Sequence, residues 1–384
     1  MSTAADHASS NSSRLLAPIF VYFAAAGIVT VMLGPLLPSL IARWQLEDAQ
    51  AGTLFASFFL GQLIGAWFAT RRLRLSVLLG AALTATGTAA LAWSTFHTAH
   101  LALFAAGLGL GLSLTAGNVI VGTSVANRAR TLALLNVAWS IGAIACPALV
   151  HACSPYGSRL FFLVTSALLA LAGLFATTIP HTTTNTSQAP TQSARIPLPD
   201  IAIAIFAASL LLYIGNENAL GGWLPSFAIR NNPATAASTI ALLYWLSALA
   251  GRLLMAALLS FITERALYIT SLLLLFLTQA ALLFAAHPAP ALVLTATILT
   301  GAALGPLYPL IVSFLLTRTG QHARLGALFA FASLGGAALP WLTGVVSTRF
   351  GGLRRGLLVP AAATLLLLVL SPGIMPRPQG DPEH

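Results

Sequence analysis

Glu217 is the residue of this chain best placed to do chemistry, because it lies inside a segment apolar enough to cross a bilayer. It stands between Asn216 and Asn218 in the stretch LLYIGNENALGGWLPSF, residues 211–227. A carboxylate in hydrocarbon is costly unless it is neutralised, paired with a cation or hydrated. The other acidic residues fall in polar tails, in a short loop or at the ends of apolar segments. Glu217 therefore predicts a functional site for proton coupling or solute binding, with a structural ion pair as the alternative.

Arg252 is the second charge within an apolar segment, and two kinds of role are open to it. It can pair with Glu217 or bind a polar or anionic solute, or it can clamp a neighbouring helix through backbone carbonyls. If the two segments are antiparallel spans, a rise of 1.5 Å per residue separates the two residues by about 9 Å of depth. A long arginine side chain can bridge that difference. We take Glu217 and Arg252 as candidates for the proton-coupling or solute-binding pair.

Uncharged hydrogen-bonding and aromatic side chains at membrane depth are candidates for the remainder of the site. Sugar sites set amides against hydroxyl groups and an aromatic face against the sugar ring. The alternatives are hydrogen bonds between helices for the amides and headgroup anchoring for tryptophans such as Trp67 and Trp223. The histidines show no metal-ligand spacing, so neither a metal nor a cofactor is predicted. The solute-binding candidates are Asn216, Asn218, Asn118, Asn136, Gln62, Trp139, Tyr244, Tyr308 and Gln279.

Composition places the chain in a membrane. Of its 384 residues, 58% are hydrophobic and only 7% are charged, whereas about 25% of residues are charged in soluble domains. The net charge of +10 comes from arginine alone, since the chain contains no lysine. The arginines cluster in short loops between apolar segments, as expected beside anionic lipid. The predicted partners are therefore the lipid bilayer and a small solute, and nucleic acid is excluded.

Twelve apolar segments are long enough to span a bilayer as helices. A Thr-, Ser- and Pro-rich stretch divides them six and six and reads as a flexible cytoplasmic linker. We predict an N-terminal six-helix bundle in residues 1–179, a linker in 180–199, and a C-terminal six-helix bundle with a short tail in 200–384. The segments lie near residues 15–40, 50–70, 76–95, 99–125, 132–153, 160–179, 200–228, 236–261, 266–286, 289–317, 324–348 and 355–374.

The two halves repeat each other at a nearly constant offset. Leu37-Pro38-Ser39 matches Leu224-Pro225-Ser226, GLGLG at 107–111 matches GAALG at 301–305, and Gly142 to Pro147 matches Gly335 to Pro340. Two parallel six-helix repeats with a solute held between them at midplane are the plan of one large class of transporters. The sequence thus predicts an all-α membrane protein of twelve transmembrane helices in two pseudo-symmetric bundles.

Orientation follows from the distribution of arginine, because cytoplasmic loops carry the excess of positive charge. With a cytoplasmic N-terminus, eleven arginines lie on the inner side and six on the outer side. We therefore expect both termini to lie in the cytoplasm. We also expect the protein to reside in a bacterial inner membrane and to act as a monomer. The outer residues would be Arg43, Arg159, Arg230, Arg349, Arg354 and Arg355.

Several short motifs resemble the major facilitator superfamily over essentially the whole chain, and its fucose permease branch in particular. They are Tyr213-Ile214-Gly215-Asn216-Glu217, Gly222-Trp223-Leu224-Pro225, Tyr244-Trp245, Gly251-Arg252-Leu253-Leu254 and Gly305-Pro306-Leu307-Tyr308-Pro309. This resemblance implies the two-bundle fold, alternating access and a sugar carried together with a proton.

The chain departs from that pattern at two places. The superfamily's loop between the second and third helices usually carries a G-x-x-x-D-R-x-G-R pattern, whereas here Gly65 leads to Ala69-Thr70-Arg71-Arg72 without the acid. The acids that proton-coupled fucose permeases carry in the first and fourth helices correspond to Gly34 and Leu114. Either Glu217 takes over proton coupling, or the protein is a facilitator.

The leading functional hypothesis is a secondary transporter, active or facilitative, that moves a small polar solute by alternating access. A sugar is the favoured solute, and efflux of amphipathic compounds is the alternative within transport. A non-transporting membrane sensor is a further alternative. The sequence lacks the HExxH and GxSxG motifs and paired intramembrane carboxylates, so an enzyme is not predicted. Without lysine there is also no Walker A motif for ATP-driven pumping.

Overall fold

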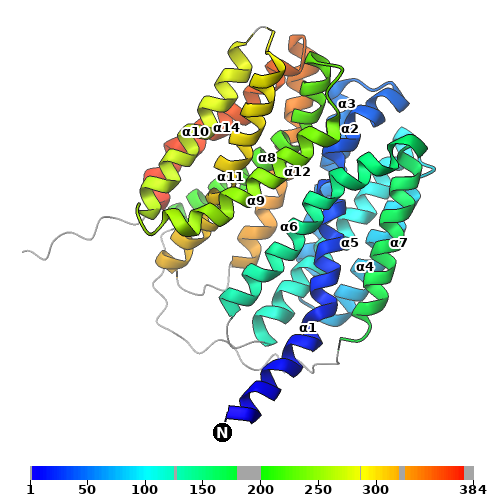
Figure 1. Ribbon diagram of the computed structural model, residues 1–384, viewed down its shortest axis with the longest axis vertical. Helices are drawn as coiled ribbons and strands as arrows, with labels where there is room; N and C mark the ends of the chain where they lie inside the picture. Colours follow the sequence, from blue (N-terminus) through cyan, green and yellow to red (C-terminus); the bar gives the residue numbers. More distant parts are fainter. Residues whose placement is uncertain (1, 125–127, 180–199, 286, 320–324, 376–384) are drawn as a thin grey trace, which may run out of the picture.

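The computed structural model describes residues 2–124, 128–179, 200–285, 287–319 and 325–375 of the chain. The described residues form helices joined by short turns, and they include no strand. Eleven helices are long and apolar enough to cross a membrane, and two more, α1 (Ser2–Val31) and α2 (Leu33–Trp44), form one further span with a bend of 41°. The chain is thus an all-α membrane protein with twelve spans (Figure 1).

Each predicted segment overlaps one of these spans. The short helices η1 (Ser154–Tyr156) and α13 (Leu353–Gly356) precede α7 and α14. The other helices are α3 (Asp48–Phe68), α4 (Leu73–Ala90), α5 (Phe96–Ser124), α6 (Arg128–Cys153), α7 (Ser158–Ala176), α8 (Asp200–Asn231), α9 (Ala237–Leu258), α10 (Glu264–Phe284), α11 (Pro290–Thr319), α12 (Leu325–Phe350) and α14 (Leu358–Ile374).

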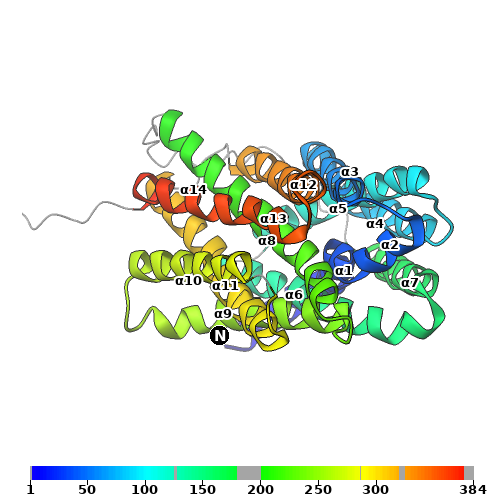
Figure 2. The same ribbon diagram turned by 90° about the horizontal axis from the view of Figure 1, so that it is seen from above.

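Helices α1–α7 pack on one another and helices α8–α14 on one another, and Figure 2 shows these two groups side by side. The repeat seen in the sequence has a structural counterpart. Gly142 of α6 lies against the backbone oxygen of Ala24 in α1, and Gly335 of α12 lies in the same way against that of Leu211 in α8. Each glycine lets two helix backbones approach where a Cβ would collide. The predicted linker, residues 180–199, lies outside the described residues.

The halves differ at the helix that opens each of them. Pro35 and Pro38 stand three residues apart in the first span, which breaks between Val31 and Leu33. Proline has no N–H to donate and its ring clashes with the preceding turn, so two prolines this close interrupt the ladder. The matching stretch of α8 has Gly222 and Pro225, and that helix continues unbroken through Asn231.

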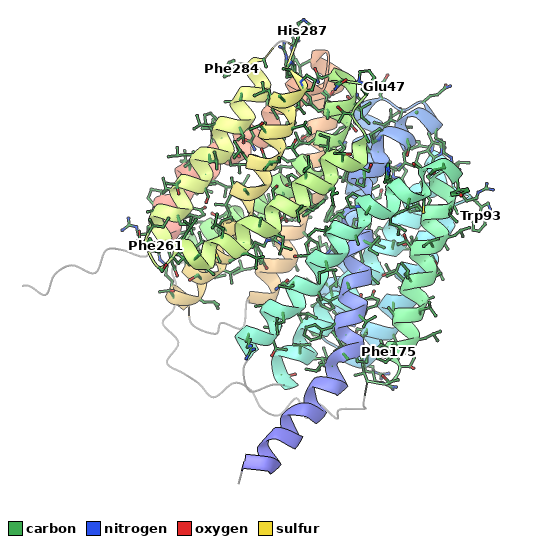
Figure 3. The ribbon with its side chains drawn as sticks, viewed as in Figure 1. Glu47, Trp93, Phe175, Phe261, Phe284 and His287 are labelled. Carbon is green, nitrogen blue, oxygen red and sulfur yellow. The ribbon has the colours of Figure 1, made fainter. Side chains whose placement is uncertain are left out.

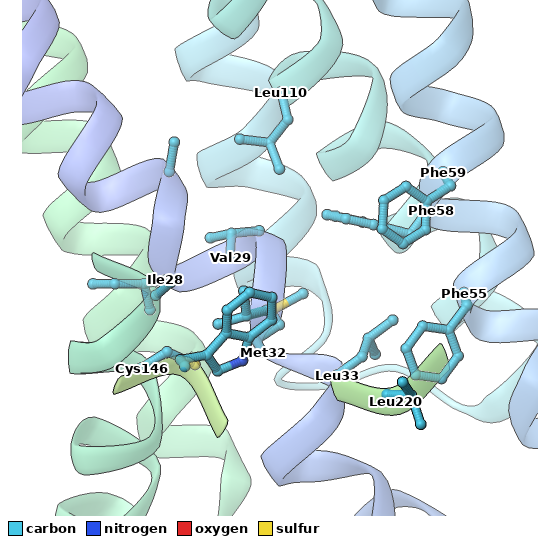
Figure 4. Packing of buried hydrophobic residues seen from close by; sticks show 14 of the residues in the cluster. Ile28, Val29, Met32, Leu33, Phe55, Phe58, Phe59, Leu110, Cys146 and Leu220 are labelled. Atoms are coloured by element: carbon cyan, nitrogen blue, oxygen red, sulfur yellow. The ribbon is translucent and has the colours of Figure 1, made fainter. Parts of the chain in front are cut away.

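Apolar side chains from both halves surround the break (Figure 4). Met32 and Leu33 lie at the break, and Figure 4 places Leu33 close to Phe55 of α3 and Leu220 of α8. All four side chains are buried in one continuous core cluster. Here Gly34 packs backbone to backbone against Gly221 of α8, where a Cβ would collide with the carbonyl oxygen. The position matching the fucose permease acid therefore has no room for any side chain in this conformation.

Large apolar side chains cover the outside of the bundle. Trp93, Phe261 and Phe284 are 61%, 86% and 87% exposed and project from its outer surface in Figure 3. Such residues suit contact with lipid tails or with the headgroup layer. The outer surface thus fits a bilayer.

The halves are tied together at one end, which we call the Asp48 end, where α2, α8 and α12 end and α3 begins. Arg230 of α8 donates two hydrogen bonds to the Asp48 carboxylate, of 2.7 and 2.5 Å. Ser347 of α12 donates to the same carboxylate at 2.5 Å, and the backbone N–H of Ala49 donates to Thr348 Oγ1 at 2.9 Å. The conformation is thus closed at the Asp48 end. We call the opposite end, where α1 and α8 begin, the terminal end.

Candidate functional site

Glu217 and Arg252 form an ion pair in the middle of the C-terminal half. The Arg252 Nη2 atom lies 2.8 Å from Glu217 Oε1, and the two side chains are 22% and 12% exposed. The Tyr213 hydroxyl donates to the same oxygen at 2.8 Å. Tyr213 stands one helical turn before Glu217 on α8, so both project from the same face. Of the roles open to Arg252, pairing with Glu217 is the one seen in this conformation.

Aromatic side chains from α9 and α11 flank this ion pair. The Tyr244 hydroxyl donates to the backbone oxygen of Glu217 at 2.8 Å. The Tyr308 ring lies 5.7 Å from the Tyr213 ring between centroids, tilted by 35°. Tyr308 lies between Pro306 and Pro309 in α11. Three tyrosine rings thus lie beside the carboxylate, and the hydroxyls of Tyr213 and Tyr244 donate hydrogen bonds to Glu217.

The N-terminal half reaches this ion pair through α6. Arg252 Nη1 donates to Ser140 Oγ at 3.3 Å, and Ser140 in turn donates to the backbone oxygen of Asn136 at 2.9 Å. Next to this contact, Trp139 of α6 meets Trp245 of α9 edge to face at 5.9 Å. Trp139 also donates from Nε1 to Thr30 Oγ1 of α1 at 3.3 Å. One arginine therefore links the charge pair of one half to a neutral side chain of the other.

Asn216 and Gln279 lie elsewhere, in a closed hydrogen-bonded triangle with Thr364. Asn216 Nδ2 donates to Thr364 Oγ1 at 2.7 Å, Gln279 Nε2 to Asn216 Oδ1 at 3.2 Å, and Thr364 Oγ1 to Gln279 Oε1 at 3.0 Å. All three side chains are fully buried. The contacts of these two amides match the alternative of hydrogen bonding between helices.

The other three asparagines bond within their own helices. Asn218, Asn118 and Asn136 each donate to the carbonyl four residues earlier, at 2.8, 2.9 and 3.1 Å. Asn118 and Asn136 are exposed although they lie within spans. A side-chain amide keeps acceptor capacity after such a bond. These three residues stay candidates for solute binding.

Gln62 stays a candidate for solute binding, whereas Trp223 does not lie where the headgroup-anchoring alternative requires. The backbone of Gln62 packs against Gly107 and Gly111 of α5, and its buried Oε1 atom has no hydrogen-bond partner. Trp223 is fully buried and donates from Nε1 to the Pro340 oxygen at 2.9 Å, so headgroup anchoring is wrong for this tryptophan. Trp67, at 66% exposure, fits that role.

Sequence reasoning missed three parts of this arrangement. Ser140 carries no signal, because a serine within a span is common. Asp48 and Arg230 are 182 residues apart and were assigned to loops or segment ends. Tyr213 had a usable signal, since a tyrosine four residues before an intramembrane glutamate shares its helix face.

Residues 19–232, more than half of the chain, match the Major Facilitator Superfamily. The chain belongs to this superfamily. That membership points to a transporter of a small solute rather than to an enzyme.

Similar proteins agree in fold. Among curated proteins, "Bypass of stop codon protein 6" of Saccharomyces cerevisiae is 22% identical, with 86% of this chain and 76% of that protein covered. Among solved structures, the D-xylose-proton symporter aligns with a TM-score of 0.78 at 15% identity, covering 95% of this chain and 98% of that one. The nucleoside transporter NupG aligns with a TM-score of 0.75 at 15% identity, and the alignment covers 94% of this chain and 100% of that one. At these identities the two structures show the fold alone.

Proposed function

We propose that this chain is a secondary transporter that moves a small, hydroxyl-rich solute, with sugars as the favoured class, by alternating access. The observation that carries the proposal is the Glu217–Arg252 ion pair, which lies at mid-span and contacts Ser140 of the other half. A carboxylate, a guanidinium and phenol hydroxyls offer donors and acceptors to sugar hydroxyls, and the aromatic rings offer faces to its C–H surface. The fucose permease resemblance supports the same class, as does the likeness in fold to a D-xylose-proton symporter and a nucleoside transporter.

Proton coupling at Glu217 is a second, separable part of this proposal. Ionised Glu217 holds Arg252 and accepts from Tyr213 on one oxygen. Protonation would remove the charge that holds Arg252 and free the guanidinium to bind solute or to change partner. Positions Gly34 and Leu114 offer no carboxyl group, so Glu217 is the acid that we assign to this step.

The alternative, efflux of amphipathic compounds, calls for a largely apolar centre. The ion pair and its hydroxyl partners favour a polar solute instead. We further propose that the N- and C-terminal bundles, residues 1–179 and 200–384, are the two moving bodies. Both termini would face the cytoplasm of a bacterial inner membrane, and the monomer would be the working unit.

The test is uptake of radiolabelled hexoses, deoxyhexoses, pentoses and nucleosides into proteoliposomes, with and without an inward proton gradient. Accumulation of one sugar only with the gradient would support a symporter, and equilibration without it would support a facilitator. If none of these solutes moves while an amphipathic dye is exported, the sugar proposal fails. If nothing moves at all, the sensor alternative gains instead.

Glu217→Gln tests the coupling step. We expect this variant to fold and bind solute but to lose proton-driven accumulation, because the amide cannot release a proton. The matched control is Glu264→Gln, since Glu264 begins α10 and its carboxylate accepts from Ser313 at 3.2 and 3.3 Å, away from the ion pair. Unchanged gradient-driven accumulation in Glu217→Gln would remove Glu217 from the coupling role.

A further inference from the structure

An apolar groove of about 680 Å³ lies at the terminal end, where α3 of one half meets α8 and α12 of the other. Its lining includes Leu63, Trp67 and Phe68 of α3, Phe331 of α12, and Ile203 and Ala207 of α8. Every lining residue is apolar. The volume falls within the range of small-molecule sites, roughly 300–1,000 Å³. A sugar would gain little here, whereas a hydrocarbon chain would bury its surface.

The groove lies at the seam between the halves. Figure 2 shows α3 and α12 adjacent at the edge of the molecule, and α8 also packs on α12. Towards the Asp48 end the same two helices are in close contact, since Gly52 meets Trp341 and Gly336 meets Phe59. Beyond Phe59 they part, and the groove occupies the space between them.

Positive charge stands beside this groove. Arg71 and Arg72 follow the end of α3 and are exposed, and the Arg71 guanidinium lies 4.8 Å from the centre of the Phe68 ring. The acid that the superfamily loop usually carries is absent, and Ala69 and Thr70 stand in its place. Within the part of the chain that the structure describes, neither arginine forms an ion pair with a carboxylate. Both charges are therefore available to an external anion.

We propose that this groove binds an acyl chain of an anionic phospholipid, whose phosphate lies against Arg71 and Arg72. Arginine matches phosphate geometry with paired N–H donors. Trp67, which is 66% exposed, sits beside those charges as tryptophan does at headgroup depth. The apolar lining thus fits the acyl chain of the lipid, and the adjacent positive charge fits its phosphate.

A lipid at this place would bias the transport cycle. The groove is bounded by both halves, so closure of the terminal end would bring its walls together. A chain lodged there favours the conformation that is closed at the Asp48 end, because a ligand stabilises the state that it binds better.

The test is native mass spectrometry of the purified full chain with phosphatidylglycerol or phosphatidylcholine of identical acyl chains. We expect one phosphatidylglycerol to be retained about 30-fold more strongly than phosphatidylcholine, as two arginines near the membrane surface would give. Arg71→Gln with Arg72→Gln should abolish that preference. Ala207→Phe, which fills the groove, should weaken retention of both lipids. Arg349→Gln, an exposed arginine near the Asp48 end, is the matched control and should change nothing.

A second measurement does not depend on those variants. In vesicles of phosphatidylglycerol brominated on its acyl chains, tryptophan fluorescence of the wild type should be quenched more than that of Trp67→Phe. Equal retention of both headgroups by the wild type, or equal quenching in the wild type and Trp67→Phe, would overturn the proposal. Displacement of the lipid by an amphipathic compound that the protein also transports would make the groove a solute subsite and overturn it as well.

Discussion

Thr30 in α1 and Glu217 in α8 occupy matching positions of the two halves, since Pro38 and Pro225 are separated by the same 187 residues. Glu217 binds Arg252 within its own half at 2.8 Å. Thr30 binds Trp139 within its own half at 3.3 Å. One plan of helices thus holds a charge pair on one side of the centre and a neutral hydrogen bond on the other.

The first helix of each half shows a second difference. Pro35 interrupts the first span, whereas Gly222 at the matching place leaves α8 continuous. The break brings Gly34 against the backbone of Gly221. The N-terminal half therefore meets the other half at this point through bare backbone.

The two halves show how a contact that moves in the transport cycle can be formed next to buried charge. An intramembrane ion pair that separated in each cycle would leave two unpaired charges. Here both charges lie in the C-terminal half and can move together. Around this ion pair, the contacts that cross between the halves are Arg252 to Ser140 and Trp139 to Trp245. Ser140 and the two tryptophans are neutral, so these contacts cost less to separate.

Removing Arg252 should break this arrangement most severely. Arg252→Met leaves Glu217 with an unpaired charge, which we expect to destabilise the protein by about 3–5 kcal/mol and to abolish uptake. Thermal unfolding in detergent measures the stability. Adding Glu217→Gln to the same chain should restore much of the lost stability, because no orphan charge remains. Equal instability of the single and double variants would contradict the proposed pairing.

Gly34→Ala tests the bare contact in the N-terminal half. The new Cβ would collide with the Gly221 oxygen, and overpacking of this kind costs about 1–3 kcal/mol. We expect the Asp48 end to open, which spin labels on the exposed positions Ala42→Cys and Ala234→Cys would report as a longer distance, with Cys146 and Cys153 replaced by alanine. Gly122→Ala is the control, because its Cβ would meet only ordinary contact. An unchanged label distance would show that the contact tolerates a side chain.

Asp48→Asn weakens the polar tie between the halves. The ion pair with Arg230 is only partly sheltered, since the arginine side chain is 40% exposed, so the loss should be about 1 kcal/mol. The same labels should report roughly a fivefold shift towards opening. Glu47→Gln, at the neighbouring exposed carboxylate, should leave the distance distribution as it is. A larger shift in Glu47→Gln than in Asp48→Asn would place the tie elsewhere.

Thr30→Val should have the smallest effect. It removes the acceptor for Trp139, a hydrogen bond worth about 1 kcal/mol, and we expect the KM for the transported solute to rise by at most about fivefold. Thr30→Ser keeps the hydroxyl and should behave as wild type. A loss of uptake in Thr30→Val as large as that in Arg252→Met would mean that the two halves contribute equally to transport, and would contradict a larger role for the charge pair.

The sequence by itself determined the membrane class, the twelve spans and the superfamily fold, because hydropathy and internal repetition are local properties of a chain. It also singled out Glu217 and Arg252, since charge within an apolar segment is rare. It did not show that Pro35 breaks the first span, although two prolines three residues apart were visible.

Only the tertiary structure decided which side chains meet. Arg252 lies 35 residues from Glu217, and Asp48 lies 182 residues from Arg230. Whether such residues touch depends on which helices are neighbours and on how each helix is rotated about its axis. The same rotation turns Asn216 towards Gln279 and Thr364, while Glu217, the next residue, faces Arg252. Successive residues of a helix point about 100° apart, so packing decided what composition left open.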